Sequence, residues 1–376
     1  MMSPPFRSYV LVSLDQIARN YRAVCSAVGP EVEVMAVVKA DAYGHGALEV
    51  SRRLIQEGAR WLAVSSVDEG VMLRSVGLQA RILVMAGFLP SEREAIAAYD
   101  LTPTAHSLED VAELDAMSQR AGRTLAFHLK LDSGMARLGT RAEPAEIVAA
   151  LRALRYARIE GLMTHFASAA DFTSPQTDQQ AARFTACYTA IREAGITLDY
   201  AHLASTNAIG YTRTKAWHNM VRAGHALYGY VSPARGSAPK QVLQVKPALT
   251  WKAKILAVKD IPEGTQVGYG GTFRAPAPMR IAILGAGYAD GVFHRLSNRG
   301  KVIAAGQLTP IIGTVSMDLT TIDITCAPDL KPGDAVTLLG TEGSASLDAQ
   351  QLARVAGTIS YNILSSISSR VRRVYV

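Results

Sequence analysis

The sequence contains only three cysteines, Cys25, Cys187 and Cys326, and they lie far apart. Three widely spaced thiols cannot build a disulfide framework and have none of the spacings typical of zinc sites, so we expect reduced cysteines and no metal. No apolar run approaches the roughly 18–20 residues that a membrane helix requires. The first residues lack the apolar core and cleavage site of a secretory signal. These features predict a cytoplasmic protein that does not contact a membrane.

Charge of one sign is only modestly in excess, with 39 Lys and Arg against 32 Asp and Glu and a net charge of +7. The basic residues are scattered, apart from a cluster at Arg370, Arg372 and Arg373. A nucleic-acid-binding protein usually carries a basic stripe interleaved with aromatics, so we expect no nucleic acid partner. The 376 residues, 49% of them hydrophobic, are typical of a globular protein of two domains.

The first two thirds of the chain alternate short apolar runs with amphipathic stretches. The predicted strands are 32–39, 61–66, 81–86, 101–105, 125–131, 158–165, 199–204 and 219–222. Their nearly continuous apolar character is typical of a parallel sheet covered on both faces. Such β-α units, numbering about eight, predict a TIM-type (β/α)8 barrel, which we assign to residues 1–238. A doubly wound sheet is the alternative, but the glycine-rich dinucleotide fingerprint expected after its first strand is absent.

After Gly229 the pattern changes to short β-rich runs separated by glycine and proline. The predicted strands are 248–258, 280–284, 301–304, 311–315 and 335–339, with turn signals at 262–264 and 331–334. Residues 232–239 have the composition of a linker. This pattern predicts a C-terminal all-β domain over residues 239–376.

Polar residues follow several of the predicted barrel strands. Lys39, His165 and Arg222 end strands, while Arg137 and Thr206 come shortly after them. Solvated strand ends are the plain alternative, but barrel enzymes build their active sites at the carboxyl ends of their strands. An amine at the lip of an apolar barrel has a lowered pKa, which suits it to form a Schiff base. The glycine in segment 222–226 exposes backbone amides that can bind phosphate. Together these features predict pyridoxal phosphate (PLP).

Segments along nearly the whole chain resemble those of bacterial alanine racemases, in the same order. They are 37–46, 130–139, 164–167, 221–229, 268–273, 287–291 and 315–318. The resemblance implies that Lys39 carries PLP and then acts as the base on one face of the substrate, with Tyr269 as the base on the other. It implies that the phosphate is held by Tyr43, Thr206, Gly224, the backbone of His225, and Tyr361. It also places Arg222 at the pyridine nitrogen and His165 beside the ring.

The resemblance further assigns the substrate carboxylate to Arg137 and the backbone of Met317. Lys130 matches a lysine that is N-carboxylated in some members and orients that arginine. In the family the lysine and the tyrosine come from different subunits, so the resemblance implies a homodimer with shared active sites. His202 is interpreted as structural, with Arg222 as its candidate partner.

The residue types suit a two-base racemase. PLP delocalises the carbanion left when the α-proton departs, and inversion requires a proton acceptor on one face and a donor on the other. A tyrosine, with an ordinary pKa of ~10, needs neighbours that favour its phenolate, and the resemblance supplies His165. An arginine stays protonated, so Arg222 leaves the pyridine nitrogen unprotonated and limits side reactions.

The chain departs from the family pattern at three places. Segment 204–208 reads Ala-Ser-Thr-Asn-Ala, so either Thr206 or Asn207 takes the phosphate position. His225 replaces an aliphatic residue, which leaves a backbone contact intact, and Ser316 replaces a frequent cysteine. On spacing alone Tyr269 is a hairpin aromatic, and only the resemblance gives it a catalytic role.

The function implied is interconversion of L- and D-alanine, supplying D-alanine for peptidoglycan or serving its breakdown. A broad-specificity amino-acid racemase is one alternative, although such enzymes tend to be secreted. A non-catalytic PLP-binding protein is another, although it would resemble the barrel alone. A fold-related decarboxylase would place a carboxylate, and not Arg222, at the pyridine nitrogen.

Overall fold

The computed structural model describes residues 4–376, which form two compact units. The barrel unit comprises Ile17–Ala42 and Ala47–Lys246. The β unit comprises the N-terminal segment up to Gln16, Tyr43–Gly46 and Pro247–Val376. Residues 1–3 belong to the segment that was predicted not to be a secretory signal, and they lie outside the described range.

The barrel unit is built on eight parallel strands in the order β8-β7-β6-β5-β4-β3-β2-β9. Their bounds are β2 (Glu33–Val37), β3 (Trp61–Val64), β4 (Arg81–Val84), β5 (Thr102–Ala105), β6 (Ala126–Lys130), β7 (Arg158–Met163), β8 (Tyr200–His202) and β9 (Met220–Ala223). A parallel bridge between Ser205 and Arg222 joins the two ends of this order. The predicted TIM-type barrel is therefore confirmed, with every predicted strand present.

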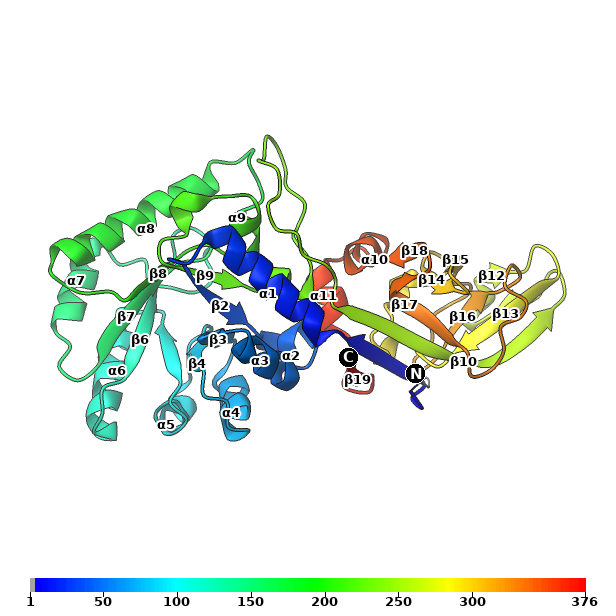
Figure 1. Cartoon of the computed structure of the whole chain (residues 1–376), viewed down its shortest axis with the longest axis horizontal. Coiled ribbons are helices and arrows are strands. Elements are labelled where there is room, and N and C mark those ends of the chain that lie inside the picture. The colour runs from blue at the N-terminus through cyan, green and yellow to red at the C-terminus, as the bar shows by residue number, and fades with distance from the viewer. Residues whose placement is uncertain (1–3) are drawn as a thin grey trace. The chain divides into compact units, whose positions relative to one another are not determined.

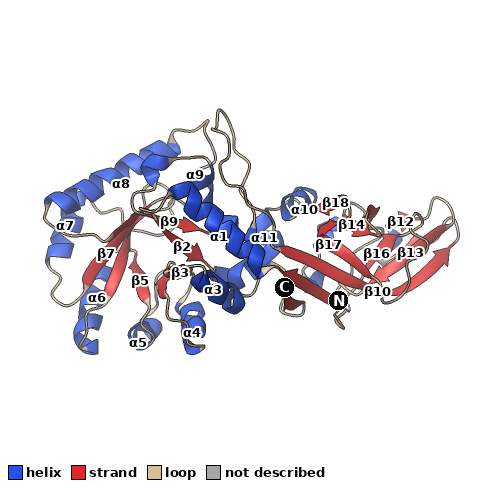
Figure 2. Cartoon of the chain, in the orientation of Figure 1, coloured by secondary structure: helices blue, strands red, loops and turns tan. Residues whose placement is uncertain are grey.

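Helices follow the strands and surround the sheet (Figures 1 and 2). They are α1 (Leu14–Val28), α2 (Lys39–Gly44), α3 (Ala47–Gln56), α4 (Val67–Ser75), α5 (Arg93–Ala98), α6 (Leu108–Ala121), α7 (Pro144–Arg152), α8 (Gln176–Glu193) and α9 (Thr206–Gly210). Helix α1 shows how the sequence specifies these helices. Ser13 Oγ accepts the Gln16 amide at 3.2 Å and caps the helix. Ile17, Tyr21 and Val24 then recur at helical intervals, and all three are buried. No helix within residues 4–376 is both long and apolar enough to span a membrane.

The β unit is a nine-stranded sheet with a two-stranded ribbon. Its strands are β1 (Ser8–Val12), β10 (Leu249–Ile261), β11 (Gln266–Val267), β12 (Phe273–Arg274), β13 (Met279–Leu284), β14 (Lys301–Ala304), β15 (Gln307–Pro310), β16 (Thr320–Asp323), β17 (Ala335–Glu342), β18 (Ala345–Leu347) and β19 (Arg372–Tyr375). The main path runs β15-β14-β17-β10-β1-β19, with β13 pairing to both β10 and β16. The separate C-terminal β domain is confirmed, and it also carries α10 (Ala349–Ala356) and α11 (Ser360–Ser365).

The N-terminal strand belongs to the β unit and not to the barrel. In β1, Val10 pairs with Trp251 of antiparallel β10 and with Arg373 of parallel β19. The contact boundary after the barrel falls at Lys246/Pro247, whereas the sequence analysis placed it at 238/239 and assigned residues 1–16 to the barrel. A short buried strand carries no mark of which sheet it joins, because its partners lie more than 230 residues away in the chain.

The strand predicted over 311–315 is wrong in position. Strand β15 precedes it, and Ile311 forms only an isolated bridge with Ile322. Gly313 then adopts a φ of 70°, and a Cβ there would lie 2.7 Å from the Val267 carbonyl oxygen. This close approach in a left-handed conformation requires glycine and ends the extended backbone.

Candidate active site

The candidate residues of the barrel unit gather at the carboxyl ends of its strands. Lys39 comes two residues after β2, His165 two residues after β7, and Lys130 is the last residue of β6. Arg222 lies in β9 and Thr206 opens α9, which follows β8. The carboxyl ends of the strands in a parallel barrel share one rim, so these side chains occupy one end of the unit.

Lys39 lies in a partly desolvated, cationic environment. Burial is the main cause of its lowered pKa, and the charges of Arg137 and Arg222 lower it further. The carboxylate of Glu69 acts in the opposite direction. A lowered pKa raises the fraction of neutral amine, the form that attacks carbonyl carbons.

The residues after Lys39 form a left-handed turn. Ala40, Asp41, Ala42 and Tyr43 have φ angles of 52°, 51°, 53° and 54°. Each non-glycine residue in this region costs about 1–2 kcal/mol, so the surroundings must hold the turn in place. Asp41 Oδ1 accepts the amide of Ala47 at 2.7 Å. Backbone strain of this kind directly after a reactive lysine is typical of a functional site.

The carboxylate of Glu69, in the first turn of α4, bridges two strand ends. Its Oε1 accepts the Ala40 amide and its Oε2 accepts the Ser65 amide, both at 2.6 Å. Glu69 therefore ties the turn after β2 to the residue that follows β3. This role of Glu69 is not evident from the sequence, because a glutamate in the first turn of a helix is ordinarily a capping residue.

Lys130 and His165 share this cationic environment. Burial lowers the pKa of Lys130 to about 8, with further effects from Arg222, Arg137 and Lys39. Burial and the charge of Arg222 hold the pKa of His165 well below its ordinary value, so its imidazole is neutral. Because the charges of these residues influence one another's pKa values, the barrel candidates form one cluster. Its members are Lys39, Lys130, Arg137, Arg222 and the neutral His165.

Arg222 is buried and held by several acceptors. Its Nη1 donates to the His202 carbonyl at 2.8 Å and lies 2.6 Å from His202 Nδ1. Its Nη2 donates to the Thr164 and Leu203 carbonyls at 2.6 and 3.0 Å and lies 3.3 Å from His165 Nδ1. The predicted contact between His202 and Arg222 is therefore present. Burial lowers the Arg222 pKa to about 10, which still leaves a full cation at neutral pH.

Thr206 and Gly224 form a cradle beside β9. Thr206 Oγ1 accepts the amides of Gly224 and Ala226 at 3.3 and 3.1 Å. Asn207 faces elsewhere, because its Oδ1 accepts the Ser232 amide at 3.1 Å. The sequence left open which of the two residues faces the Gly224 backbone. In the structure Thr206 lies against it and Asn207 does not. His225 opens a 3-10 turn, and its ring stacks on that of Tyr230 at 5.0 Å.

Arg137 lies on an exposed loop after β6. Asp132 shapes this loop, with Oδ1 accepting the amides of Gly134, Met135 and Ala136 at 3.1, 3.0 and 2.9 Å. Burial opposes ionisation of Asp132, but these amides together with Arg141 bring its pKa to about 2. Asp132 is a second residue that the sequence analysis did not assign, since its aspartate resembles an ordinary turn residue.

Tyr269 and Met317 lie in neighbouring loops of the β unit and expose their side chains. Tyr269 is 77% exposed and Met317 53%. The Tyr269 carbonyl accepts the Thr314 hydroxyl at 2.9 Å, and the Met317 carbonyl accepts the Ala289 amide at 2.9 Å. Glycines with φ of 73° and 71° flank Tyr269 and form the tight turn that projects it. Large exposed side chains on an ordered turn are typical of an interaction surface.

Tyr43 and Tyr361 are also neighbours in the β unit. Their ring centroids lie 6.0 Å apart at an interplanar angle of 45°. Gly44, next in the chain, packs so closely on α11 that a Cβ there would lie 2.3 Å from the Leu364 carbonyl oxygen. Its own carbonyl accepts Arg373 Nε at 3.1 Å. The candidates thus fall into a barrel group and a β-unit group, each brought together locally.

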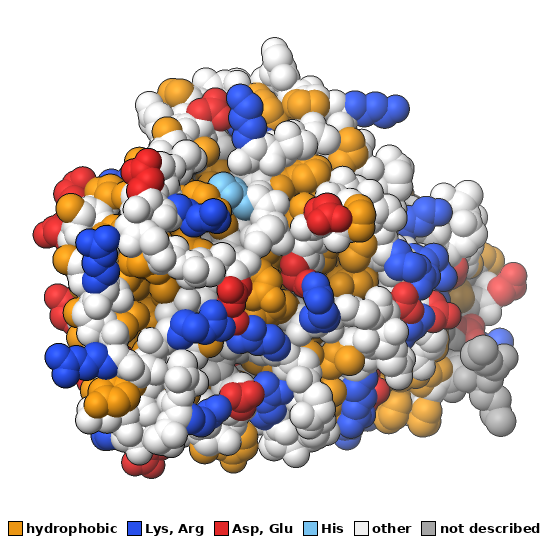
Figure 3. Space-filling model, turned by 60° about the vertical axis from the view of Figure 1, so that its left-hand side comes forward, with side chains coloured by type: hydrophobic (Ala, Val, Ile, Leu, Met, Phe, Trp, Pro, Cys, Tyr) orange, Lys and Arg blue, Asp and Glu red, His pale blue; other side chains and the backbone are white. Residues whose placement is uncertain are grey.

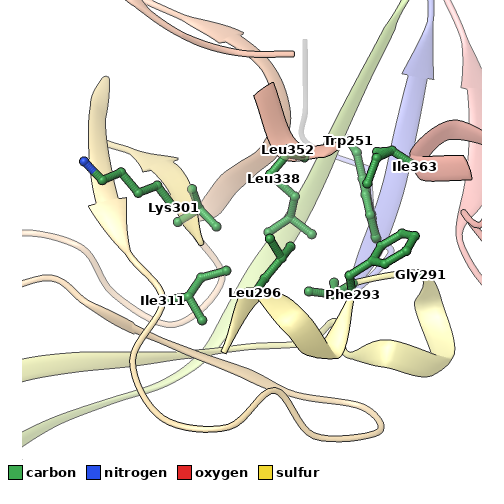
Figure 4. A pocket seen from close by; sticks show the side chains of 11 residues that line it. Trp251, Gly291, Phe293, Leu296, Lys301, Ile311, Leu338, Leu352 and Ile363 are labelled. Atoms are coloured by element: carbon green, nitrogen blue, oxygen red, sulfur yellow. The ribbon is translucent and has the colours of Figure 1, made fainter. Parts of the chain in front are cut away.

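Other surfaces of the molecule offer weaker sites. A pocket in the β unit is lined by apolar side chains such as Trp251, Leu296 and Leu338, with Lys301 as its charged lining residue (Figure 4). It contains none of the candidate residues and is part of the packing of α10 and α11 on the sheet. On the face drawn in Figure 3, Lys and Arg side chains are interspersed with Asp and Glu and form no basic stripe. Among residues 4–376 no group of three or more His, Cys, Asp and Glu side chains could hold a metal.

Comparisons with known proteins give a consistent result. Residues 12–233 match the family model for the N-terminal domain of alanine racemase, and residues 248–375 match that for its C-terminal domain. The alanine racemases of Carboxydothermus hydrogenoformans and Synechocystis are each 39% identical, covering 97% and 98% of this chain and 98% and 99% of their own.

Solved structures agree with these matches. The alanine racemase of Streptomyces lavendulae superposes with a TM-score of 0.92 at 31% identity, over 100% of this chain and 98% of that one. The Bartonella henselae enzyme, solved with covalently bound pyridoxal phosphate, gives 0.87 at 28% identity, over 99% and 100%.

Proposed function

This chain belongs to the alanine racemase family and is an isomerase that interconverts L- and D-alanine; from that premise we propose that it acts with PLP, using Lys39 and Tyr269 as its two bases. The observation that carries the proposal is Lys39 itself. It is a lysine with a lowered pKa, set at the rim of a barrel and followed by a strained turn. These are properties of a nucleophilic amine and not of a solvated strand end.

The residues of this chain fit PLP. The cradle of Thr206 and Gly224 offers a hydroxyl and a backbone turn suited to a phosphate, and the hydroxyls of Tyr43 and Tyr361 and the backbone of His225 complete the proposed contacts. The guanidinium charges of Arg137 and Arg222 favour the binding of an anionic cofactor and of a substrate carboxylate. When bound, PLP delocalises the electron pair left on the α-carbon of the substrate.

Arg222 has a distinct role at the ring nitrogen. A guanidinium only donates hydrogen bonds, so it holds an unprotonated nitrogen as an acceptor. The nitrogen then withdraws fewer electrons than a protonated one, which limits side reactions such as transamination. His165, placed beside the ring, accepts from Arg222 at Nδ1 and so carries its proton on Nε2. That N–H can stabilise the phenolate form of Tyr269.

Arg137 and the Met317 amide are the proposed contacts of the substrate carboxylate. Lys130 acts on Arg137 from within the barrel group, and its pKa of about 8 leaves a useful fraction of neutral amine. A neutral amine adds to carbon dioxide, forming an N–C bond and releasing one proton. We propose that Lys130 is N-carboxylated, as the resemblance implies for some members of the family, so that the resulting anion orients the Arg137 guanidinium.

The second base completes the site from another subunit. Tyr269 belongs to the β unit, and its side chain is largely exposed on its own chain. In a head-to-tail homodimer the partner subunit's Tyr269 would reach the face of the substrate opposite Lys39. Each base then removes the α-proton of one enantiomer, and the base on the opposite face donates a proton to form the other enantiomer. The product, D-alanine, is a building block of peptidoglycan.

Incubating the purified, PLP-loaded protein with single L-amino acids in deuterated water tests the proposal, with chirality and α-proton exchange followed over time. Racemisation confined to alanine with deuterium incorporation is the expected result. Turnover of several bulky amino acids would instead indicate a broad-specificity racemase. A borohydride-reducible adduct at Lys39 without exchange would indicate a non-catalytic PLP-binding protein.

A further inference from the structure

A line of buried polar side chains crosses the interior of the barrel from Arg222 to Glu160. Arg222 Nη1 lies 2.6 Å from His202 Nδ1, and His202 Nε2 lies 2.8 Å from His128 Nδ1. His128 Nε2 then faces Glu160 Oε2 at 3.6 Å. All four residues are at most 2% exposed. Barrel interiors are usually filled by branched apolar side chains, so a polar line of this length requires an explanation.

The two ends of the line fix its hydrogen-bond direction. Arg222 can only donate, so His202 Nδ1 accepts and the His202 proton lies on Nε2. His202 Nε2 then donates to His128 Nδ1, which places the His128 proton on Nε2, facing a carboxylate that can only accept. Each imidazole is therefore held in a single tautomer. Hydrogen bonds fix the direction from Arg222 as far as His128, whose Nε2 makes no hydrogen bond to any described residue, and the charge of the Glu160 carboxylate 3.6 Å away favours the proton on that nitrogen.

The two histidines are neutral and the ends are charged. Burial is the main cause of the lowered pKa of His128 and of His202. Burial opposes ionisation of Glu160, but His128 and Arg81 bring its pKa to about 2. Among the described contacts none joins Arg222 directly to a carboxylate, so Glu160 is the acid that terminates its line.

Two arginines hold the Glu160 end of the line. Arg81 Nη2 donates to Glu160 Oε2 at 2.7 Å, and Arg158 Nη2 donates to Oε1 at 3.2 Å. The Arg81 guanidinium also lies 4.1 Å above the ring of Trp61. Gly161 makes room for the line, because a Cβ there would lie 2.6 Å from His128 Nδ1.

We propose that Glu160 is a positioning residue that acts through His128 and His202 to fix the orientation of the Arg222 guanidinium. The proposal rests on the proposed function in that Arg222 faces the cofactor ring nitrogen. Because Nη1 and Nη2 both face acceptors already, a guanidinium fixed in this orientation keeps its Nε–H as the donor available to the ring nitrogen. Partners at this remove commonly change activity by about 10–100-fold when they are altered.

Exchanging Glu160 for glutamine should reverse the direction of the hydrogen bonds along the line. The amide oxygen then stays at the Oε1 position, where it accepts from Arg81 Nη1 and Arg158 Nη2. The NH2 group replaces Oε2, where it opposes Arg81 Nη2 and faces His128 Nε2. His128 would then accept at Nε2 and carry its proton on Nδ1, and His202 would follow. Both His202 Nδ1 and Arg222 Nη1 would then be donors at 2.6 Å, which would force the guanidinium to move.

The experiment combines Glu160→Gln with ¹⁵N NMR of the histidine rings and with kinetics. We expect the wild-type protein to show the Nε2–H tautomer at His128 and His202, and the variant to show Nδ1–H. We expect kcat to fall about tenfold, KM for alanine to change little, and the absorbance of bound PLP to change. Glu33→Gln is the matched control, because it removes the Arg60 ion-pair partner at another barrel strand without touching the line.

The result that overturns the proposal is an Nδ1–H tautomer at either histidine in the wild type. Unchanged tautomers and kcat in Glu160→Gln, or an equal loss in Glu33→Gln, would overturn it as well. If Glu160→Gln does not fold, the wild-type tautomers still decide. A wild-type protein that racemises nothing would contradict the proposed function but leave the tautomer measurement valid.

Discussion

The carboxylate of Glu69 accepts the amide of Ala40 at 2.6 Å, in the strained turn that directly follows Lys39. Its other oxygen accepts the Ser65 amide, so one side chain stabilises two strand ends. In Glu69→Gln the carboxamide can accept only one of these amides, and its NH2 group opposes the other. We expect a loss of about 1–3 kcal/mol in the free energy of unfolding and faster release of PLP.

Urea unfolding and the decay of cofactor absorbance after dilution measure these two effects. Asp68→Asn is the control, since it removes the same charge from an exposed neighbour in α4. Equal effects of the two substitutions would contradict a specific role for Glu69.

The cradle of Thr206 gives a second prediction. Thr206→Val keeps the shape of the side chain but removes the acceptor of the Gly224 and Ala226 amides. The same hydroxyl is the proposed contact of the PLP phosphate, and a hydrogen bond to a charged group contributes about 1.5–3 kcal/mol, so we expect weaker PLP binding by roughly tenfold or more. Fluorescence titration of the apoprotein with PLP measures the affinity. Thr185→Val, at an exposed helical position, should leave it unchanged.

The lowered pKa of Lys130 predicts how the free energy of unfolding depends on pH. Its folded pKa of about 8 lies below the unfolded value of ~10.4, so the unfolded chain binds more protons between these limits. The contribution of Lys130 to stability therefore rises as pH increases from about 8 to about 10. We expect this rise to vanish in Lys130→Met and to persist in the exposed-site control Lys215→Met, as measured by urea unfolding at several pH values in CO2-free buffer.

A related measurement tests the proposed carboxylation. Carbamate formation consumes the neutral amine, so ¹³C-labelled bicarbonate should give one NMR signal that Lys130→Met removes. A labelled signal that persists in this variant would contradict the assignment.

The gathering of polar side chains at one rim of the barrel could be predicted from the sequence, because the signals for it are local. Apolar runs ending in Lys39 or Arg222 mark buried parallel strands and the point where each emerges. Glu69, His128 and Glu160 could not be found in this way, because their meaning depends on partners 29 to 74 residues distant in the sequence. A histidine within an apolar strand looks the same whether it packs alone or belongs to a line of hydrogen bonds.

The same limit applies to the fold. The barrel strands were predicted because eight similar runs repeat with helices between them. Strand β1 was assigned to the wrong unit, since its pairing with β10 and β19 joins opposite ends of the chain. The tyrosine at 269 has no local sign of function at all, and its role follows from the resemblance and not from its spacing.

The proposed roles of Lys39 and Tyr269 as the two bases predict that the two enantiomers lose activity unequally. Tyr269→Phe removes the proton acceptor for one enantiomer and leaves Lys39 for the other. We expect α-proton exchange of L-alanine in deuterated water to fall about 10²–10⁴-fold, with exchange of D-alanine far less affected and PLP still bound. Tyr99→Phe, at another exposed tyrosine, should change neither rate. Loss of the cofactor in Tyr269→Phe would contradict its assignment as a base.

The proposal that two subunits share each active site predicts complementation between two inactive variants. Lys39→Ala and Tyr269→Phe can be co-expressed with different affinity tags and purified through both, which selects the mixed dimer. If each site takes Lys39 from one subunit and Tyr269 from the other, one of its two sites has both bases and the other has neither. We expect about half the wild-type specific activity in the mixed dimer and almost none in either parent. If instead both bases came from the same chain, each site of the mixed dimer would lack one of them, and the preparation would stay inactive while remaining dimeric by sedimentation. The two arrangements therefore differ by a large signal and not by a small change in rate.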